Sequence, residues 1–213
     1  ALGARTIAIP SDADFAFPLA KVLAAISPNT RLIFINTPHN PSGRPVSEAD
    51  IRAVVAAAPH AVVFIDEAYH DFQGVEYLSF TREFPNVIVG RTFSKAYGLA
   101  GIRVGLLVGP PELLAPIRYV MPLFNLNAVA VAALRAAIAD TQFMPWCVAQ
   151  ARESKALLYE ALTRLGLPYW KSETNFVLVN AGERLPEFVA GLRAKGVLVR
   201  DRSTEHGWAA CFR

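Results

Sequence analysis

Four short apolar runs, each rich in β-branched residues, constrain the fold of this chain more than any other feature. The runs are Arg31 to Asn36, Ala61 to Asp66, Asn86 to Gly90 and Val104 to Val108. A strand that is almost entirely apolar is typical of a sheet buried on both faces, as parallel sheets are. Helical patterns lie between the runs, so we expect an α/β fold with a mainly parallel sheet covered by helices.

The first connecting helix has a clear start and a clear end. Ser47-Glu48-Ala49-Asp50 resembles a capping box, and apolar residues then recur at helical spacing as far as Ala58. The hydroxyl of Ser47 should therefore accept a hydrogen bond from a free backbone N–H group at the start of the helix. Pro59 should end the helix, because proline cannot continue the helical hydrogen bonding.

A second unit is expected after Pro110-Pro111. Its predicted elements are helices over Pro111 to Tyr119, about 126 to 140 and about 145 to 165, a strand at Asn175 to Val179, a helix at Pro186 to Lys195 and a strand at Val197 to Arg200. The last three indicate a small α+β lobe at the C-terminal end. We place the domain boundary inside the long helix, near Glu153, which makes residues 1–152 the large domain and residues 153–213 the small one.

The composition is that of a folded protein with a sizeable core, since 53% of the 213 residues are hydrophobic and 18% are charged. The net charge of +3 is modest and the basic residues are scattered, so we expect no nucleic-acid partner. No apolar stretch reaches the roughly 18 residues needed to span a bilayer. Cys147 and Cys211 lack the spacing of a zinc site or a disulfide framework, which indicates free thiols in the cytoplasm and no metal site.

The two ends of the sequence indicate that segments are missing. The residues from Ala1 to Arg5 contain neither an initiator Met nor the beginning of a signal peptide. The chain stops at Arg213, where a strand is expected to begin. We therefore expect upstream sequence to precede Ala1 and the small lobe to be truncated.

Polar residues with complementary chemistry follow three of the expected strands. Asn40 lies in the turn after the first, Asp66 and Tyr69 follow the second, and Thr92 to Lys95 follow the third. In open α/β sheets, ligands bind beyond the carboxyl ends of the strands. Pyridoxal 5′-phosphate (PLP) needs an amine that forms an imine and a carboxylate that keeps its pyridine nitrogen protonated, and both are present here.

Three motifs carry a family resemblance. They are Asn40-Pro41-Ser42-Gly43, Asp66-Glu67-Ala68-Tyr69 and Ser94-Lys95-x-x-Gly98-Leu99-Ala100-Gly101-x-Arg103. In this order they resemble the signatures of the class I/II aminotransferases, which are fold-type I PLP enzymes. Asp-Glu-Ala-Tyr-x-x-Phe and Arg-Thr-x-Ser-Lys-x-Tyr-Gly-Leu-Ala-Gly are most similar to the histidinol-phosphate aminotransferase branch. The resemblance covers nearly the whole chain and implies a PLP-binding large domain followed by a small C-terminal domain.

The resemblance implies how a PLP molecule would be held. Lys95 would form a Schiff base with the cofactor and then move the substrate proton, and Asp66 would pair with the pyridine nitrogen. Hydrogen bonds to the ring oxygen would come from Asn40 and Tyr69. The phosphate would be bound by three further residues, Thr92, Ser94 and Arg103.

Three residues are candidates for substrate binding. Arg213 falls where the family has its substrate-anion arginine, Arg200 is the second candidate for that role, and Asn175 is expected near the substrate. The implied reaction is transamination between an amino acid or amino-alcohol phosphate and a 2-oxo acid, catalysed by a homodimer. The family's phosphate-seating loop, ring-stacking aromatic residue and cross-dimer tyrosine would all precede Ala1.

Two alternative functions stay open at this point. The first is a PLP-dependent decarboxylase or lyase, because these cofactor residues do not decide which bond of the α-carbon breaks. The second is a PLP-sensing effector domain of a transcription regulator, which would need a DNA-binding helix-turn-helix upstream.

Overall fold

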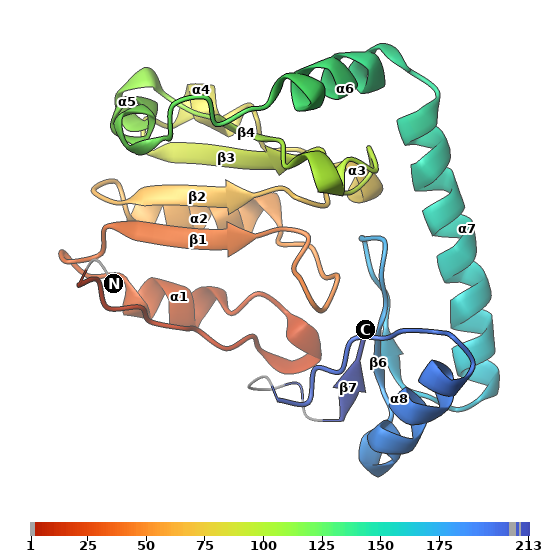
Figure 1. Cartoon of the computed structure of the whole chain (residues 1–213). Helices are drawn as coiled ribbons and strands as arrows, with labels where there is room; N and C mark the ends of the chain where they lie inside the picture. Colours follow the sequence, from red (N-terminus) through yellow and green to blue (C-terminus); the bar gives the residue numbers. More distant parts are fainter. Residues whose placement is uncertain (1–2, 205–207, 209) are drawn as a thin grey trace.

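A four-stranded sheet lies at the centre of the larger lobe of the structure (Figure 1). The computed structural model describes residues 3–204, 208 and 210–213. The strands, in spatial order, are β1 (Leu32–Asn36), β2 (Val62–Asp66), β3 (Val87–Thr92) and β4 (Gly105–Val108). The first three run parallel and β4 is antiparallel to β3, so the mainly parallel sheet expected from the sequence is confirmed.

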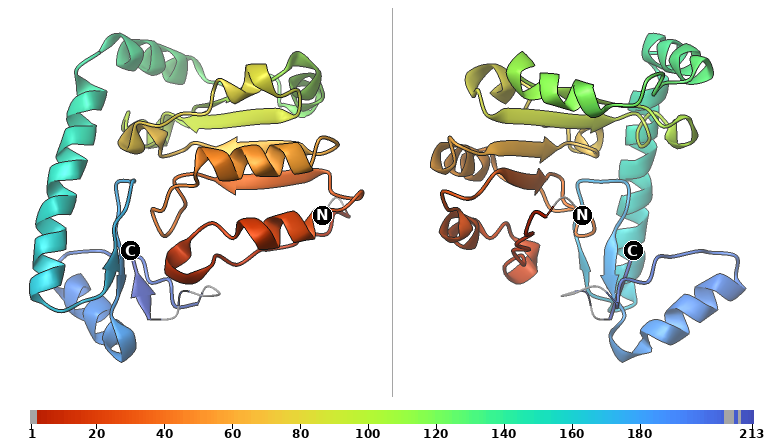
Figure 2. Two further views of the ribbon diagram at one scale, coloured as in Figure 1. Left: turned by 180° about the vertical axis from the view of Figure 1, so that it is seen from behind. Right: turned by 60° about the vertical axis from the view of Figure 1, so that its left-hand side comes forward.

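The rear face of this sheet, defined as the face covered by α2 (Glu48–Ala57), contains the main core. Strand residues that alternate along the chain, such as Ile35, Val63 and Val89, are at most 2% exposed there. They pack against the apolar side of α2, and Figure 2 (left) shows α2 lying over β1 and β2. This alternation follows from the two-residue period of a strand, which sends successive side chains to opposite faces.

The opposite face, called the front face below, corrects one expectation. We predicted strands buried on both faces, but the ring of Phe34 is 69% exposed and Leu32 is 49% exposed. Both point away from α2, and the residues that the structure describes leave this side of β1 uncovered. An apolar pattern indicates that a strand can be buried on both faces. Whether both faces are buried depends on which other segments pack against them.

The start of α2 agrees with the sequence. The hydroxyl of Ser47 accepts a hydrogen bond from the backbone N–H of Asp50 at 3.1 Å and donates one to its carboxylate at 2.7 Å. The helix ends at Ala57, two residues before Pro59. The cap predicted at Ser47 is thus confirmed.

A second, three-stranded antiparallel sheet forms the small lobe. Its strands are β5 (Tyr169–Trp170), β6 (Leu178–Asn180) and β7 (Cys211–Phe212), and α8 (Leu185–Ala194) packs on it. The small α+β lobe is therefore present. The remaining elements are η1 (Ala13–Phe15), α1 (Leu19–Ala25), α3 (His70–Gln73), α4 (Phe80–Glu83), η2 (Ala100–Ile102), α5 (Pro111–Val120), α6 (Ala128–Ala139), α7 (Phe143–Arg164) and η3 (Gly182–Arg184).

Two predicted strands of the small lobe differ from the structure. The strand expected at Asn175 to Val179 begins only at Leu178. The one expected at Val197 to Arg200 does not form, because the N–H of Val197 bonds instead to the carbonyl of Leu192 and closes α8. At this point the backbone bonds between Arg200 and Arg213 and from Arg202 to Cys211 form only an isolated bridge between Asp201 and Phe212.

Helix α7 connects the two sheets along one side of the molecule (Figures 1 and 2). Near its start, Val148 packs with Tyr69 and Phe72 beside the large sheet. Near its end, Leu162 belongs to the core of the small lobe. The division near Glu153 falls between these two contacts and stays a prediction. None of the helices described is both long and apolar enough to cross a membrane.

We predict that Ser47→Ala lowers the free energy of unfolding by about 1 kcal/mol, because the substitution removes the cap of α2. Urea unfolding measures this change. Ser79→Ala is the matched control, since Ser79 precedes α4 without making a side-chain cap bond. An equal loss in both variants would contradict the role of the cap.

Candidate active site

The carboxyl ends of β1, β2 and β3 bring the predicted cofactor residues to one edge of the large sheet. Asn36, Asp66 and Gly90 are direct neighbours in the strand register. In Figure 1 the three arrowheads point to the same side, toward α3 and α7. The loops that follow these strands contain the amide, the carboxylate with the phenol, and the amine that the sequence singled out.

Asp66 is the partly buried acid of this edge. One of its carboxylate oxygens accepts a hydrogen bond from the backbone N–H of Ala68 at 3.0 Å. Burial raises the pKa of Asp66, while that hydrogen bond and the positive charge of Lys95 act in the opposite direction. The effect of burial therefore outweighs these two stabilising interactions, and a cationic ligand would favour the ionised form of the carboxylate.

Lys95 and Tyr69 lie next to each other. The amine nitrogen of Lys95 is 5.3 Å from the centre of the Tyr69 ring. The ring itself is 5% exposed and packs with Phe72, Ala96 and Val148, so its position is fixed by a small apolar cluster. Lys95 is exposed, and its amine is accessible to a reactive carbonyl compound.

The residues predicted to bind a phosphate lie at the end of β3 and in the loop after it. The hydroxyl of Thr92 accepts a hydrogen bond from the backbone N–H of Ser94 at 3.1 Å, which orders the turn before Lys95. Arg103 lies beyond this turn, is exposed, and donates a hydrogen bond to the carbonyl of Ala100 at 2.8 Å. Thr92 and Ser94 thus lie together, whereas the role of Arg103 stays a prediction.

Arg213 reaches the large domain from the far end of the sequence. Its guanidinium donates a hydrogen bond to the side-chain oxygen of Asn40 at 2.7 Å and lies over the ring of Phe176, 4.6 Å from its centre. Burial lowers the pKa of Arg213, and the positive charges of Arg202 and Arg200 act in the same direction. A partly buried guanidinium among other cations is well suited to a negatively charged ligand.

The other two predicted substrate residues are less directly placed. Arg200 is exposed and exchanges backbone hydrogen bonds with Arg213 at 2.8 and 2.9 Å. Asn175 is exposed in the loop before β6. Their roles in substrate binding stay predictions.

The small lobe contacts the turn that carries Asn40. The backbone N–H of Glu173 donates a hydrogen bond to the carbonyl of Gly43 at 2.8 Å. Gly43 has a φ of +73°, and a Cβ built on it would lie 2.1 Å from the hydroxyl of Ser172 and 2.9 Å from its Cα. The close approach of the two lobes at this point therefore requires glycine.

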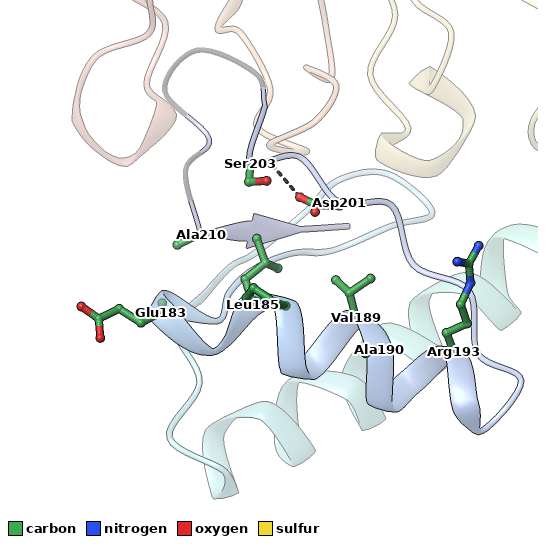
Figure 3. A pocket seen from close by; sticks show the side chains of 10 residues that line it. Glu183, Leu185, Val189, Ala190, Arg193, Asp201, Ser203 and Ala210 are labelled. Carbon is green, nitrogen blue, oxygen red and sulfur yellow. Dashed lines mark hydrogen bonds between the residues drawn. The ribbon is translucent and has the colours of Figure 1, made fainter.

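Two of the grooves in the described part of the chain are relevant here. One, of about 640 Å³, lies on the front face between the sheet and α5, and Asp66 and Thr92 are among the residues that line it. The other, of about 510 Å³, lies in the small lobe between α8 and the segment Asp201–Ser203 (Figure 3). Only the first contains predicted cofactor residues, and its volume is in the range of small-molecule sites.

Sequence reasoning missed two residues of this region. The ring of Phe176 lies 5.2 Å from that of Tyr69 and also contacts Arg213, so it lies between two predicted site residues. Asn36 is the register neighbour of Asp66 and has a buried side-chain oxygen without a hydrogen-bond partner. The period of β1 would have indicated Asn36, because it places this residue on the same face as Asp66.

The sequence matches the family model for aminotransferase class I and II over residues 2–213. The chain belongs to this family. Among curated relatives, the histidinol-phosphate aminotransferase of Symbiobacterium thermophilum is 41% identical over 202 residues, which are 93% of this chain and 56% of the relative. The aromatic amino acid aminotransferase of Rhodococcus erythropolis is 37% identical over 205 residues, 95% of this chain and 57% of that protein. This aminotransferase-family chain spans about half the length of the curated relatives it matches.

Solved structures that are similar to this chain have the same fold. The structure of histidinol-phosphate aminotransferase from Sinorhizobium meliloti in complex with pyridoxal 5′-phosphate matches with a TM-score of 0.89 and 28% identity, covering 99% of this chain and 59% of that one. A decarboxylase from Sulfurospirillum multivorans matches with a TM-score of 0.85 at 20% identity, covering 100% of this chain and 65% of that one, a likeness of fold alone. The fold class expected from the sequence is therefore confirmed.

The contact between Gly43 and Ser172 leads to a second prediction. Gly43→Ala should lower the free energy of unfolding by about 1–3 kcal/mol more than Gly74→Ala does, because it adds a clash to the strain of a positive φ. Gly74 is the matched control, since its φ is +83° and no atom lies within 4 Å of a Cβ built on it. Urea unfolding compares the two variants, and equal losses would contradict a tight contact between the lobes.

The raised pKa of Asp66 leads to a third prediction. Without a cofactor, ionisation of Asp66 should make the fold less stable as the pH rises above the ordinary value of 3.8 and through the raised folded-state pKa. Asp66→Asn removes this effect, so the variant should unfold at higher urea than the wild type at neutral pH. The difference should vanish below pH 3.8, where the carboxyl is protonated in both states.

Asp201→Asn serves as a control for which we expect the opposite change in stability at neutral pH. Hydrogen bonds from Ser203 lower the pKa of Asp201, so its replacement should reduce stability at neutral pH. A loss of stability at neutral pH in Asp66→Asn would show that burial is not the dominant influence on Asp66.

Proposed function

We propose that this chain binds PLP through Lys95 and that the protein catalyses transamination. The observation that carries the proposal is the juxtaposition of an exposed amine, Lys95, with the partly buried carboxylate of Asp66 at neighbouring strand ends. Membership of the aminotransferase family supports the same chemistry.

The residues present fit this cofactor. When bound, PLP supplies a protonated pyridine ring that accepts electrons from the α-carbon of an amino substrate. Asp66 would hold the proton on the pyridine nitrogen, and this cation would offset the unfavourable burial of its carboxylate. The amine of Lys95 would hold the cofactor covalently and would move the proton at the α-carbon of the substrate.

The other site residues would orient the cofactor. Asn40 and Tyr69 would hydrogen-bond its ring oxygen, and this role is supported by the interaction of both side chains with Arg213. Its phosphate would be bound by Thr92, Ser94 and Arg103, of which the first two already form an ordered turn. An arginine with two hydroxyl groups suits a phosphate dianion.

We infer that Arg213 binds an anionic group of the substrate, with Arg200 and Asn175 nearby. The substrates would be an amino acid or amino-alcohol phosphate as donor and a 2-oxo acid as acceptor. The names of the relatives at 36–41% identity support a place in histidine biosynthesis, and the aromatic amino acid aminotransferase at 37% makes an aromatic amino acid the competing donor. Turnover of histidinol phosphate compared with that of phenylalanine, each with 2-oxoglutarate, decides between them.

Transamination is favoured over decarboxylation because the similar decarboxylase structures are less than 25% identical to this chain, whereas aminotransferases reach 41%. Product analysis with a substrate labelled in its carboxyl group separates the two reactions, since only decarboxylation releases labelled CO₂.

For the whole protein, we further propose a cytoplasmic homodimer in which residues 1–152 and 153–213 belong to different domains.

Our fourth prediction tests the assignment of Lys95. Mixed with PLP, the wild-type chain should give the visible absorption band of a protein-bound imine, and Lys95→Ala should lose it. After borohydride reduction, mass spectrometry should find the cofactor on the peptide that contains Lys95. Lys171→Ala, which removes an exposed lysine of the small lobe, is the control and should keep both results. An unchanged band in Lys95→Ala would exclude Lys95 as the anchoring residue.

A further inference from the structure

Glu67 is a fully buried acid that the proposed chemistry does not use. It follows Asp66 directly and is 0% exposed. Its backbone N–H continues the sheet by donating to the carbonyl of Gly90 at 2.8 Å. Because successive residues of an extended chain alternate between faces, the carboxylate of Glu67 lies on the rear face when that of Asp66 lies on the front face.

One oxygen of the Glu67 carboxylate is bound to Arg91. The Nε of Arg91 donates to it at 2.7 Å, and an Nη of the same guanidinium binds the exposed carboxylate of Glu76 at 2.7 Å. Arg91 directly precedes Thr92, the last residue of β3 and the start of the turn that leads to Lys95. Glu67 is therefore connected to the strand end that carries the amine.

The other oxygen of Glu67 is connected to the turn that carries Asn40. It accepts a hydrogen bond from the backbone N–H of Tyr77. The hydroxyl of Tyr77 donates to the carbonyl of Val46 at 2.9 Å, and the N–H of Val46 donates to the hydroxyl of Thr37 at 3.0 Å. Thr37 opens the turn after β1, and its own N–H binds the carbonyl of Asp66 at 3.0 Å.

The residues of this hydrogen-bond network are shielded from solvent. Tyr77, Val46 and Thr37 are at most 5% exposed, and the side chain of Arg91 is 17% exposed. A carboxylate is costly to bury and an apolar side chain would have filled the same space. Unlike an apolar side chain, the carboxylate makes directional contacts. Each of its oxygens fixes the position of one neighbouring segment through a hydrogen bond of defined geometry.

We propose that Glu67 is a positioning residue: through Arg91 and Tyr77 it holds the three strand-end loops of Asn40, Asp66 and Lys95 in the arrangement that PLP binding requires. The inference rests on the proposed function for its consequence, which is cofactor affinity. The bracing of the loops is a property of the chain itself and can be measured without any cofactor.

Two variants break the two arms of this network separately. In Glu67→Gln, the amide oxygen can still accept from Tyr77, but the amide nitrogen cannot accept from Arg91. Tyr77→Phe keeps the N–H bond to Glu67 and loses the hydroxyl bond to Val46. The control is Val54→Ala, which weakens the same core from α2 and removes no hydrogen bond.

Hydrogen–deuterium exchange of the cofactor-free chain, followed by peptide mass spectrometry, tests the bracing. In Glu67→Gln, exchange should rise at least about tenfold over residues 91–98, and in Tyr77→Phe over residues 37–46, beyond the change in Val54→Ala at matched global stability. If Glu67→Gln does not fold, Tyr77→Phe still tests the arm of the network that runs from Glu67 through Tyr77 to the turn of Asn40. Exchange rates equal to those of Val54→Ala would overturn the proposal.

A titration of each folded variant with PLP, read by visible absorbance, tests the consequence. Both variants should bind PLP at least about tenfold more weakly than Val54→Ala, a loss of about 1.4 kcal/mol. Equal PLP affinity would show that the network has no effect on the site. If the wild type itself forms no visible band, the proposed function fails, whereas the exchange experiment still accepts or rejects the bracing by Glu67.

Discussion

The parallel pairing of β1, β2 and β3 is the constraint on which the rest of this structure depends. Parallel strands place their carboxyl ends at one edge, and the register makes Asn36, Asp66 and Gly90 direct neighbours. This register therefore fixes where the loops after β1, β2 and β3 begin. A shift by one residue would move Asp66 to the rear face and Glu67 to the front, and would exchange the two acids between their environments.

Asp66 and Glu67 are adjacent in the sequence, but their carboxylates lie in different environments. Asp66 has one backbone hydrogen bond and a raised pKa, so its charge is incompletely stabilised in the protein. Glu67 is more deeply buried but has a guanidinium and a backbone N–H as partners. A ligand cation would therefore stabilise the charge of Asp66, whereas the charge of Glu67 is already stabilised by partners within the protein.

Much of the fold and part of the site could be predicted from the sequence, and the limits have physical causes. The strands of the large sheet and the cap at Ser47 are encoded by local patterns, and the structure reproduces them within two residues. The bond between Arg213 and Asn40 joins residues 173 positions apart, which no local pattern specifies. The exposure of Phe34 and the bond of Val197 to α8 likewise depend on what other segments supply, and the apolar pattern alone could not reveal either.

The length of α7 has a consequence for the precision of the site. A continuous helix of 22 residues is a rod of about 33 Å, so a tilt of roughly 5° at Phe143 would move its far end by about 3 Å. That displacement exceeds the tolerance of the hydrogen bonds that Asn40 and Gly43 accept from the small lobe. The inclination of α7 and the contacts that the small lobe makes with Asn40 and Gly43 are therefore coupled to each other.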